Sequence, residues 1–478
     1  MSKKAARRVR LCQLAVIAGT AVLWPAGLAL AGTDTWNASD GNWSVPGNWN
    51  PANVPGAGDD VGISFADGVN RTITYDYAGA AVTLDSLMLD LTNFTGTAGS
   101  VLSMSGNNLT ANIEVIGNNG ASAIIQTGGT NNSTSLYLGN NTGSTGAYAL
   151  SGTGSLSVRN SEVVANSGAG TFTQSGSTNT TGYLQLGGNV GATGTYALDS
   201  TGSLSVTGYE DVGFGGSGTF NQTAGSNTSG GIDVGYMGTG AYNQSGGTTA
   251  VTQNNFYLGY STRSTGTYTL SNTGSLSVTG SEYVGNSGLG TFTQSGGTNT
   301  LSNGEGHFFY LGFQGNSSGS YTLGGGTLAL NGHEYIGYSG AGTFDQTGGT
   351  NNVTGSHFLY LGFGGGSSGK YTLSAGLLRA RNETVGLDGV GTFVQTSGTN
   401  TVSGNILTLG GDPGSVGTYT LSGDGAMNSG TEYIGFGGTG NVVQSAGTNS
   451  LGANGLLYLG DNRGSTGTYT LRDRSKII

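Results

Sequence analysis

The sequence repeats one short phrase along most of its length. "GTFTQSGGTNT" occupies residues 290–300, and close copies begin at Gly170, Gly342 and Gly391. A second phrase, in which "GTYTLS" is followed by "GSLSV" and "EYVG", alternates with it and is clearest over residues 266–285. Repetition at a fixed period is typical of architectures in which each unit buries its apolar face only against its neighbours. We therefore expect a long stack of similar units.

Each unit is marked by an anchor residue, which directly follows Gly-Thr or an equivalent pair. The anchor is apolar and most often aromatic. Successive anchors lie about 24 residues apart, and Leu102 is a degenerate first anchor. We expect the anchor rings to stack on one another inside the fold. The first phrase places tyrosine in this slot, at Tyr148, Tyr196, Tyr268, Tyr321, Tyr371 and Tyr419. The second phrase places phenylalanine there, at Phe172, Phe220, Phe292, Phe344 and Phe393.

Each unit contains three short runs that alternate apolar and polar residues, such as "TYTL", "SLSV" and "EYVG". Alternation with period two indicates strands with one buried face. The 96 glycines among 478 residues then serve as turns between strands. Units of equal length stack with their strands parallel, at about 4.8 Å per coil. The sequence therefore predicts an all-β fold, a right-handed parallel β-helix (β-solenoid) of about sixteen coils with three short strands per coil.

Two amide slots recur in the second phrase. We expect both sets to form structural ladders in which stacked amides satisfy one another and the turns. A sugar-binding row of amides and rings is the alternative. The glutamines are Gln174, Gln222, Gln294, Gln346, Gln395 and Gln444. The asparagines are Asn179, Asn227, Asn299, Asn351, Asn400 and Asn449.

A glutamate recurs in the "EYVG" slot of the first phrase. We expect these side chains at a corner of the coil, where they cap turn amides; a row of cation sites is the alternative. Because they occur in alternate units, they suit neither a paired-carboxylate glycosidase nor a calcium cage. His307, His333 and His357 make only a weak case for a metal site, because neither cysteine nor clustered aspartate accompanies them. We expect no cofactor, metal or catalytic residue. The glutamates are Glu162, Glu210, Glu282, Glu334, Glu383 and Glu432.

Residues 1–31 have the composition of a Sec signal peptide. Five basic residues precede an apolar run that ends in Ala29-Leu30-Ala31. An uncleaved membrane anchor is the alternative, because the run is long enough to span a bilayer. Cleavage removes the single cysteine, Cys12, and leaves ten basic against 25 acidic residues. A chain this acidic argues against nucleic acid or an anionic membrane as partner, and we expect no membrane span in the mature chain.

Residues 32–100 differ from the repeats, and residues 101–478 form the predicted solenoid. Trp36, Trp43 and Trp49, the tryptophans of the mature chain, fall within fourteen residues. We expect a cap here, because an open solenoid end exposes a core and a strand edge. A tryptophan cluster that stacks on sugar rings is the alternative, so these three residues are the candidate glycan contacts.

The opening "W…GNW…NW.P..VP..GDDV", followed by units of "GTYTLS…EYVG…GTFTQSGGTNT…LYLG", resembles bacterial secreted proteins with autotransporter-associated β-strand repeats. The resemblance implies export and surface display, often as passenger domains of adhesin-like proteins in Gram-negative bacteria. Such proteins continue into a translocator barrel or a sorting helix, whereas this sequence ends in "RDRSKII". We therefore expect an incomplete C-terminus, or a separate partner that supplies the anchor.

These observations favour an exported, non-enzymatic scaffold on the cell surface or in an extracellular matrix, with surface glycans or other surface proteins as partners. A carbohydrate-binding protein and a polysaccharide-acting β-helix enzyme are the alternatives, because solenoids host many functions. An enzyme requires a cluster of charged side chains outside the repeat. The nearest such patch contains Arg379, Arg381, Glu383 and Asp388.

Overall fold

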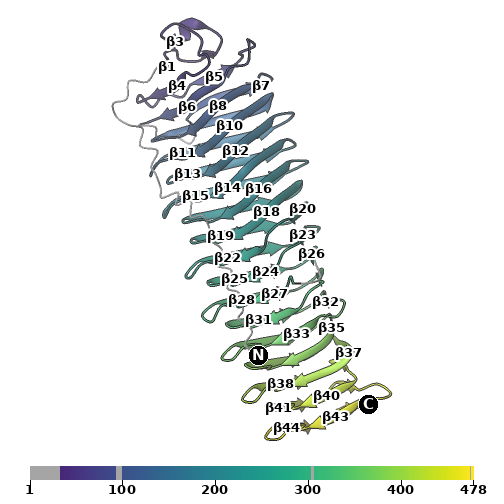
Figure 1. The fold of residues 1–478 in the computed structure, drawn as a ribbon. Helices are drawn as coiled ribbons and strands as arrows, with labels where there is room; N and C mark the ends of the chain where they lie inside the picture. Colours follow the sequence, from purple (N-terminus) through teal and green to yellow (C-terminus); the bar gives the residue numbers. More distant parts are fainter. Residues whose placement is uncertain (1–32, 93–98, 303–305, 474) are drawn as a thin grey trace.

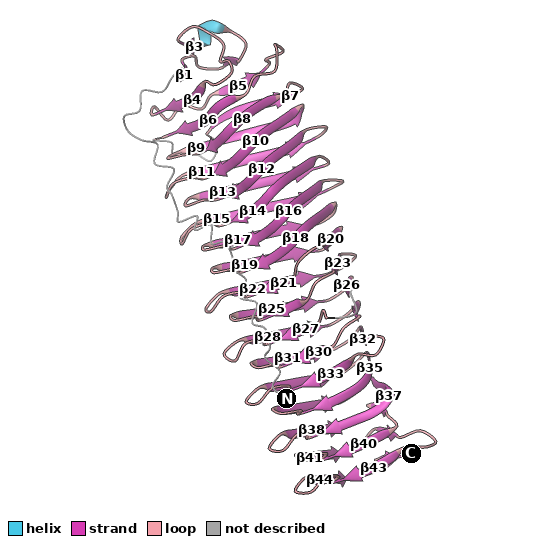
Figure 2. Cartoon of the chain, in the orientation of Figure 1, coloured by secondary structure: helices cyan, strands magenta, loops and turns pink. Residues whose placement is uncertain are grey.

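The computed structural model describes residues 33–92, 99–302, 306–473 and 475–478. The predicted signal peptide lies outside these residues. The described chain is a parallel β-solenoid in which strands follow one another down a long stack (Figure 1). Loops project from both edges of the stack, and the short 3₁₀ helix η1 (Pro46–Asn48) lies at the N-terminal end (Figure 2). No helix among the described residues is long and apolar enough to cross a membrane.

One sheet, here called sheet B, receives one strand from each coil. Its strands are β2 (Gly41–Asn42), β5 (Thr72–Tyr75), β7 (Ser100–Ser105), β9 (Ala121–Gly128), β11 (Thr145–Ser151), β13 (Ala169–Ser175), β15 (Thr193–Asp199), β17 (Ser217–Gln222), β19 (Thr239–Gln244), β22 (Thr265–Leu270), β25 (Leu289–Gln294), β28 (Ser318–Leu323), β31 (Ala341–Gln346), β34 (Ser368–Leu373), β36 (Val390–Gln395), β38 (Val416–Leu421), β41 (Thr439–Gln444) and β44 (Thr466–Leu471).

The second sheet, sheet A, receives the other two strand segments of a coil, either separate or joined through an irregularity. Its strands are β1 (Thr33–Trp36), β3 (Trp49–Asn50), β4 (Asp60–Phe65), β6 (Leu84–Leu91), β8 (Leu109–Ile116), β10 (Thr130–Leu138), β12 (Ser155–Val164), β14 (Thr178–Leu186), β16 (Ser203–Val212), β18 (Ser226–Val234), β20 (Thr248–Val251), β21 (Phe256–Leu258), β23 (Ser275–Val278), β24 (Glu282–Val284), β26 (Thr298–Leu301), β27 (Phe309–Leu311), β29 (Thr327–Leu330), β30 (Glu334–Ile336), β32 (Thr350–Val353), β33 (Phe358–Leu361), β35 (Leu377–Val385), β37 (Thr399–Leu409), β39 (Ala426–Asn428), β40 (Thr431–Ile434), β42 (Thr448–Ser450), β43 (Leu456–Leu459) and β45 (Lys476–Ile477).

The anchor rings form the predicted internal column. Register places each anchor beside that of the next coil, as Tyr268 beside Phe292 and Phe292 beside Tyr321. From Tyr148 to Tyr419 the rings are buried, and successive rings stack with centroids 4.5–5.0 Å apart. Stacking at the coil spacing therefore continues through the core of the solenoid, as the sequence predicted.

The stack has about eighteen turns, somewhat more than the sixteen expected. The column continues upstream of Leu102 to Ile73, and β2 pairs with β5 one coil earlier. These two coils lack the Gly-Thr signature, so their anchors could not be recognised by comparison with the repeats. Parallel pairing thus extends into residues 33–92, and only β1 and β3 pair antiparallel among the described strands.

A glycine precedes the anchor by two residues and lies where the chain of one coil meets its neighbours. A Cβ on Gly290 would lie 2.0 Å from the backbone nitrogen of Gly285, too close for any side chain. Gly285 itself has φ of +75°, a conformation that side chains with a Cβ rarely adopt. The repeated "G" of "GTFTQ" is therefore required by close backbone approach.

The three tryptophans pack together as the core of the N-terminal end. Trp49 meets Trp36 and Trp43 edge to face at 4.9 and 4.7 Å, and Tyr75 extends the cluster at 5.0 Å from Trp43. Each indole is only 2–3% exposed, and Nε1 of Trp49 donates to the carbonyl of Trp43. These rings present no free face to a sugar, so the alternative of a glycan contact does not fit their position. Their position suits the expected cap.

Candidate functional site

The glutamines lie in the core, but they do not stack on one another in a ladder. Register places leucine on both sides of Gln395, at Leu373 and Leu421. Nε2 of Gln395 donates to the carbonyls of Gly398 and Ala426, each at 3.0 Å, and Oε1 accepts from the Tyr419 hydroxyl at 2.6 Å. The predicted amide-to-amide ladder is wrong, because leucine flanks most of these glutamines. Gln222 and Gln244 are neighbours in register, but their amides donate to backbone carbonyls instead of to each other.

The glutamates also lie in the core, so their predicted position at a turn-capping corner is wrong. Glu282 is fully buried between Phe256 and Phe309 of the adjacent coils. Nδ2 of Asn299 donates to both carboxyl oxygens, at 3.2 and 3.1 Å. The same pairing recurs at six further coils, as Glu114–Asn131, Glu162–Asn179, Glu210–Asn227, Glu334–Asn351, Glu383–Asn400 and Glu432–Asn449.

Burial raises the pKa of all these carboxyls and so favours their neutral form. Burial raises the pKa of Glu282 to about 8, and the hydrogen bond from Asn299 opposes the rise only in part. Glu383 shifts the same way, to a pKa of about 7. In every layer the Asn Oδ1 is buried and has no donor. A protonated carboxyl supplies a donor that a carboxylate lacks. The glutamates therefore build the interior, and a row of cation sites, the alternative considered for them, does not fit this position.

The most distinctive outer surface of the described chain is an array of aromatic rings on sheet A. In β21, β24, β27, β30 and β33 a tyrosine alternates with inward-facing apolar or glutamate side chains, so it points out of the solenoid. A second column of rings follows the glycine that comes after each of these strands except β24. We call the two columns the aromatic face. The first consists of Tyr257, Tyr283, Tyr310, Tyr335 and Tyr360, and the second of Tyr260, Phe313, Tyr338 and Phe363.

The two columns pack in a herringbone arrangement. First-column rings stack with centroids 4.7–5.1 Å apart, and Tyr338 stacks at 5.1 and 5.0 Å on Phe313 and Phe363. Ring planes in contact lie about 3.5 Å apart, so this spacing inclines the planes by roughly 45° to the column. Rings of different columns meet at 81–89° in most pairs. The columns therefore tilt in opposite senses. Tyr310 and Tyr335 are 8% exposed, and the other seven rings are half-buried.

One edge of the aromatic face carries histidine and phenylalanine. His333 lies 5.3 Å from Phe308 and 5.4 Å from Phe358, and its Nδ1 accepts from the backbone N–H of Phe358 at 2.9 Å. Burial first, and then the nearby His357, lower the pKa of His333. A neutral imidazole thus extends the aromatic surface. Among the residues that the structure describes, no three His, Cys, Asp or Glu side chains gather to hold a metal ion.

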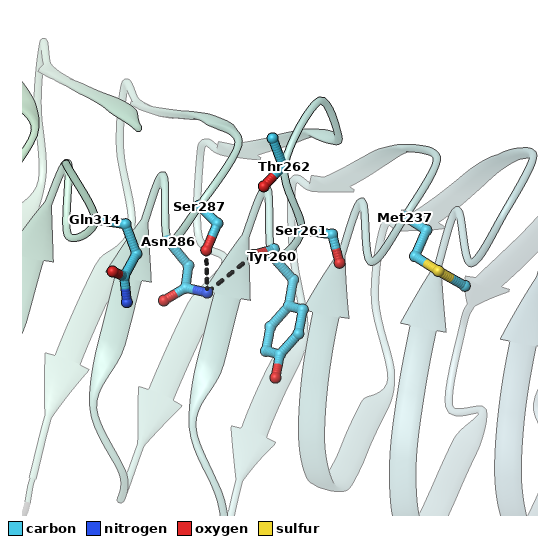
Figure 3. A pocket seen from close by; sticks show the side chains of 7 residues that line it. All are labelled: Met237, Tyr260, Ser261, Thr262, Asn286, Ser287 and Gln314. Atoms are coloured by element: carbon cyan, nitrogen blue, oxygen red, sulfur yellow. Dashed lines mark hydrogen bonds between the residues drawn. The ribbon is translucent and has the colours of Figure 1, made fainter. Parts of the chain in front are cut away.

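The second column is interrupted at Asn286, where a shallow open groove of about 660 Å³ crosses the adjoining loops. Nδ2 of Asn286 donates to the carbonyl of Tyr260 at 2.9 Å and to Oγ of Ser287 at 3.4 Å. Figure 3 shows Met237 and Gln314 at opposite ends, with Tyr260 and Asn286 between them. The side chains that line the groove are Met237, Tyr260, Ser261, Thr262, Asn286, Ser287 and Gln314, and none is charged.

Two aspartates continue the first column toward the N-terminus. Register places Asp211 beside Asp233, and Asp233 beside Tyr257. Both are almost fully buried, at 3% and 4% exposed. Burial raises the pKa of both carboxyls, and that of Asp233 reaches about 8. Two adjacent buried carboxyls share one proton rather than ionise together.

The charged patch singled out in the sequence is not assembled as a cluster. Arg379, Arg381 and Asp388 are exposed, whereas Glu383 is buried in the core with Asn400. Arg379, Arg381 and Glu383 have the same parity along β35. The register irregularity between Ala380 and Asn382 turns Glu383 to the inner face, while the two arginines point outward. Comparison of the chain with protein-family models, with curated proteins and with solved structures gave no match.

Proposed function

We propose that the chain is an exported, non-enzymatic scaffold that binds extended neutral glycans along its aromatic face. The observation that carries the proposal is the herringbone of rings over five consecutive coils, from Tyr257 to Phe363. Aromatic rings provide apolar contact area, and tyrosine adds a hydroxyl that can bond a sugar. The coil spacing is of the order of one pyranose unit of an extended glycan. A chain laid along the solenoid axis would thus meet similar rings at successive sugars.

The setting of this face also favours a neutral partner. The side chains of the aromatic face carry no formal charge, while the whole chain has a formal net charge of −10. An acidic chain does not attract polyanions. Export through a Sec signal peptide, display at the outer surface of a Gram-negative-type bacterium, and the resemblance to autotransporter-associated repeat proteins belong to the same proposal. Adhesion to, or assembly of, a surface or matrix layer is the role we infer.

The proposal is tested by co-sedimentation of the mature chain with insoluble neutral polysaccharides. Tyr338→Ala opens a hole in the second column, and we expect clearly weaker retention on the polysaccharide. Tyr458→Ala is the control, because Tyr458 is an exposed tyrosine in the register of the first column, four coils beyond Tyr360 and outside the aromatic face. Thermal unfolding of both variants separates lost binding from lost structure. Equal retention of the two variants and the wild type would exclude the aromatic face as the binding surface.

The second candidate function, polysaccharide cleavage, is favoured by the carboxyl pair of Asp211 and Asp233. Glycosidases use two carboxyls, one of which must stay protonated at working pH. The pair lies at the end of the first column, where a bound glycan would pass. Both side chains are covered in this structure, which disfavours direct attack on a sugar. Release of reducing ends by the wild type, and its loss in Asp211→Asn, would establish this alternative.

A further inference from the structure

The groove at Asn286 occupies a defect in the second column of the aromatic face. Phe313 and Phe363 lie two coils apart, and the ring of Tyr338 fills the interval between them. Tyr260 and Phe313 are separated by the same two coils, but the intervening residue is Asn286. The periodic packing of the column therefore provides space for a ring that the chain itself does not supply.

Polar groups border this space instead of apolar ones. Nδ2 of Asn286 donates to the Tyr260 carbonyl, and Oδ1 of Asn286 takes no part in that hydrogen bond. The hydroxyls of Ser261 and Thr262 and the amide of Gln314 lie along the same groove (Figure 3). One aromatic ring beside several uncharged hydrogen-bonding groups is the combination that recognises a pyranose, which has an apolar face and a rim of hydroxyls.

We propose that the groove is a subsite for one pyranose unit of a neutral glycan, seated against Tyr260 and bonded by Asn286, Thr262 and Gln314. This inference rests on the proposed function, because the subsite continues the path of a glycan along the aromatic face. The residues that line the groove are uncharged, which suits a neutral sugar. Arg263, the one charged residue adjacent to them in the sequence, is not part of the lining. The subsite adds specificity at one position, whereas the aromatic face supplies general affinity.

The decisive variant is Asn286→Phe, which places in the gap the residue that Phe313 and Phe363 already provide in equivalent coils. We expect this variant to fold with unchanged or higher thermal stability, because it completes the second column. Its matched control is Leu387→Phe, which introduces the same ring at the next position of the column beyond Phe363. Calorimetric titration with cellohexaose, xylohexaose and laminarihexaose measures the affinity of each variant.

We expect Asn286→Phe to weaken binding of the best hexasaccharide by about tenfold or more, and Leu387→Phe to leave it unchanged. Gln314→Ala should weaken it by several-fold. Retention on long polysaccharide should survive in Asn286→Phe and fall in Tyr338→Ala. Unchanged hexasaccharide affinity in Asn286→Phe, with Tyr338→Ala still defective, would refute the subsite alone. Unchanged binding in both variants would refute the aromatic face as well. Tighter binding of polygalacturonate than of the neutral hexasaccharides would refute the assignment to a neutral sugar.

Discussion

Replacement of one buried glutamate should change how the stability of the solenoid depends on pH. Glu282 has a pKa of about 8 in the folded chain, against 4.5 for an ordinary glutamate. Between these two values the unfolded chain has lost a proton that the folded chain retains. The free energy of unfolding therefore falls by about 1.4 kcal/mol per pH unit for this one group. Its contribution is complete below pH 4.5 and is lost as pH rises through 8.

The amide of Asn299 gives the anion of Glu282 only partial stabilisation, which burial outweighs. Nδ2 of Asn299 donates to the carboxyl, and Phe256 and Phe309 cover its two sides. Burial first, and then this carboxyl, raise the pKa of the Tyr321 hydroxyl. Between pH 5 and pH 7.5 we expect the contribution of Glu282 to the free energy of unfolding to fall by about 3 kcal/mol. Because the other layers repeat the arrangement, the wild type should be markedly more stable at pH 5 than at pH 8.

The perturbation is Glu282→Gln, which keeps the shape and removes the ionisation. The new amide can donate to Oδ1 of Asn299, which has no donor at present. Urea unfolding of the mature chain, followed by circular dichroism from pH 5 to pH 8, measures the effect. With rising pH, the free energy of unfolding of the variant should fall less steeply than that of the wild type, by about 1.4 kcal/mol per pH unit. Asp388→Asn, at an exposed position, should match the wild type. Parallel slopes for Glu282→Gln and wild type, or wild-type stability that rises with pH, would refute the reasoning.

Three further substitutions test the core. Phe292→Ala should cost about 3–5 kcal/mol by opening a cavity in the ring column, measured by urea unfolding; unchanged unfolding would contradict a packed column. Gly290→Ala should cost about 1–3 kcal/mol or more, since its Cβ meets backbone at 2.0 Å, while Gly315→Ala, with open space around it, should be neutral in thermal unfolding. Glu282→Leu should lower the free energy of unfolding by about 1–3 kcal/mol, because the buried amide of Asn299 loses its hydrogen-bond acceptor. Adding Asn299→Leu should restore stability in a double-mutant cycle.

The sequence was sufficient for the architecture, because the repeat specifies the register. Period-two alternation placed Tyr268 and Phe292 inside, and identical spacing required them to stack. The coils around Ile73 and Gly41 escaped notice because they lack the Gly-Thr signature. Repetition alone could not distinguish a corner from the core, so Glu282 was assigned to a turn. Its burial becomes clear only when the next coil brings Asn299 against it.

The aromatic face was missed for a related reason. Tyr310 and Tyr335 stand between inward-facing residues in "FYL" and "EYI", and their outward direction follows from the same alternation. The signal was present in these tripeptides and in the aromatic residue after the following glycine. What the sequence could not supply was the tilt of the two columns. It also could not show that Asn286 interrupts one of them beside a groove.

The central claim is that the solenoid binds polysaccharide without cleaving it. The most direct measurement incubates the mature chain with each neutral polysaccharide that retains it, and quantifies reducing ends over time alongside the bound fraction. The account predicts stable retention with no increase in reducing ends over a protein-free control. Reducing ends that rise with time in the wild type, and stay flat in Asp211→Asn, would contradict it and assign the carboxyl pair a catalytic role.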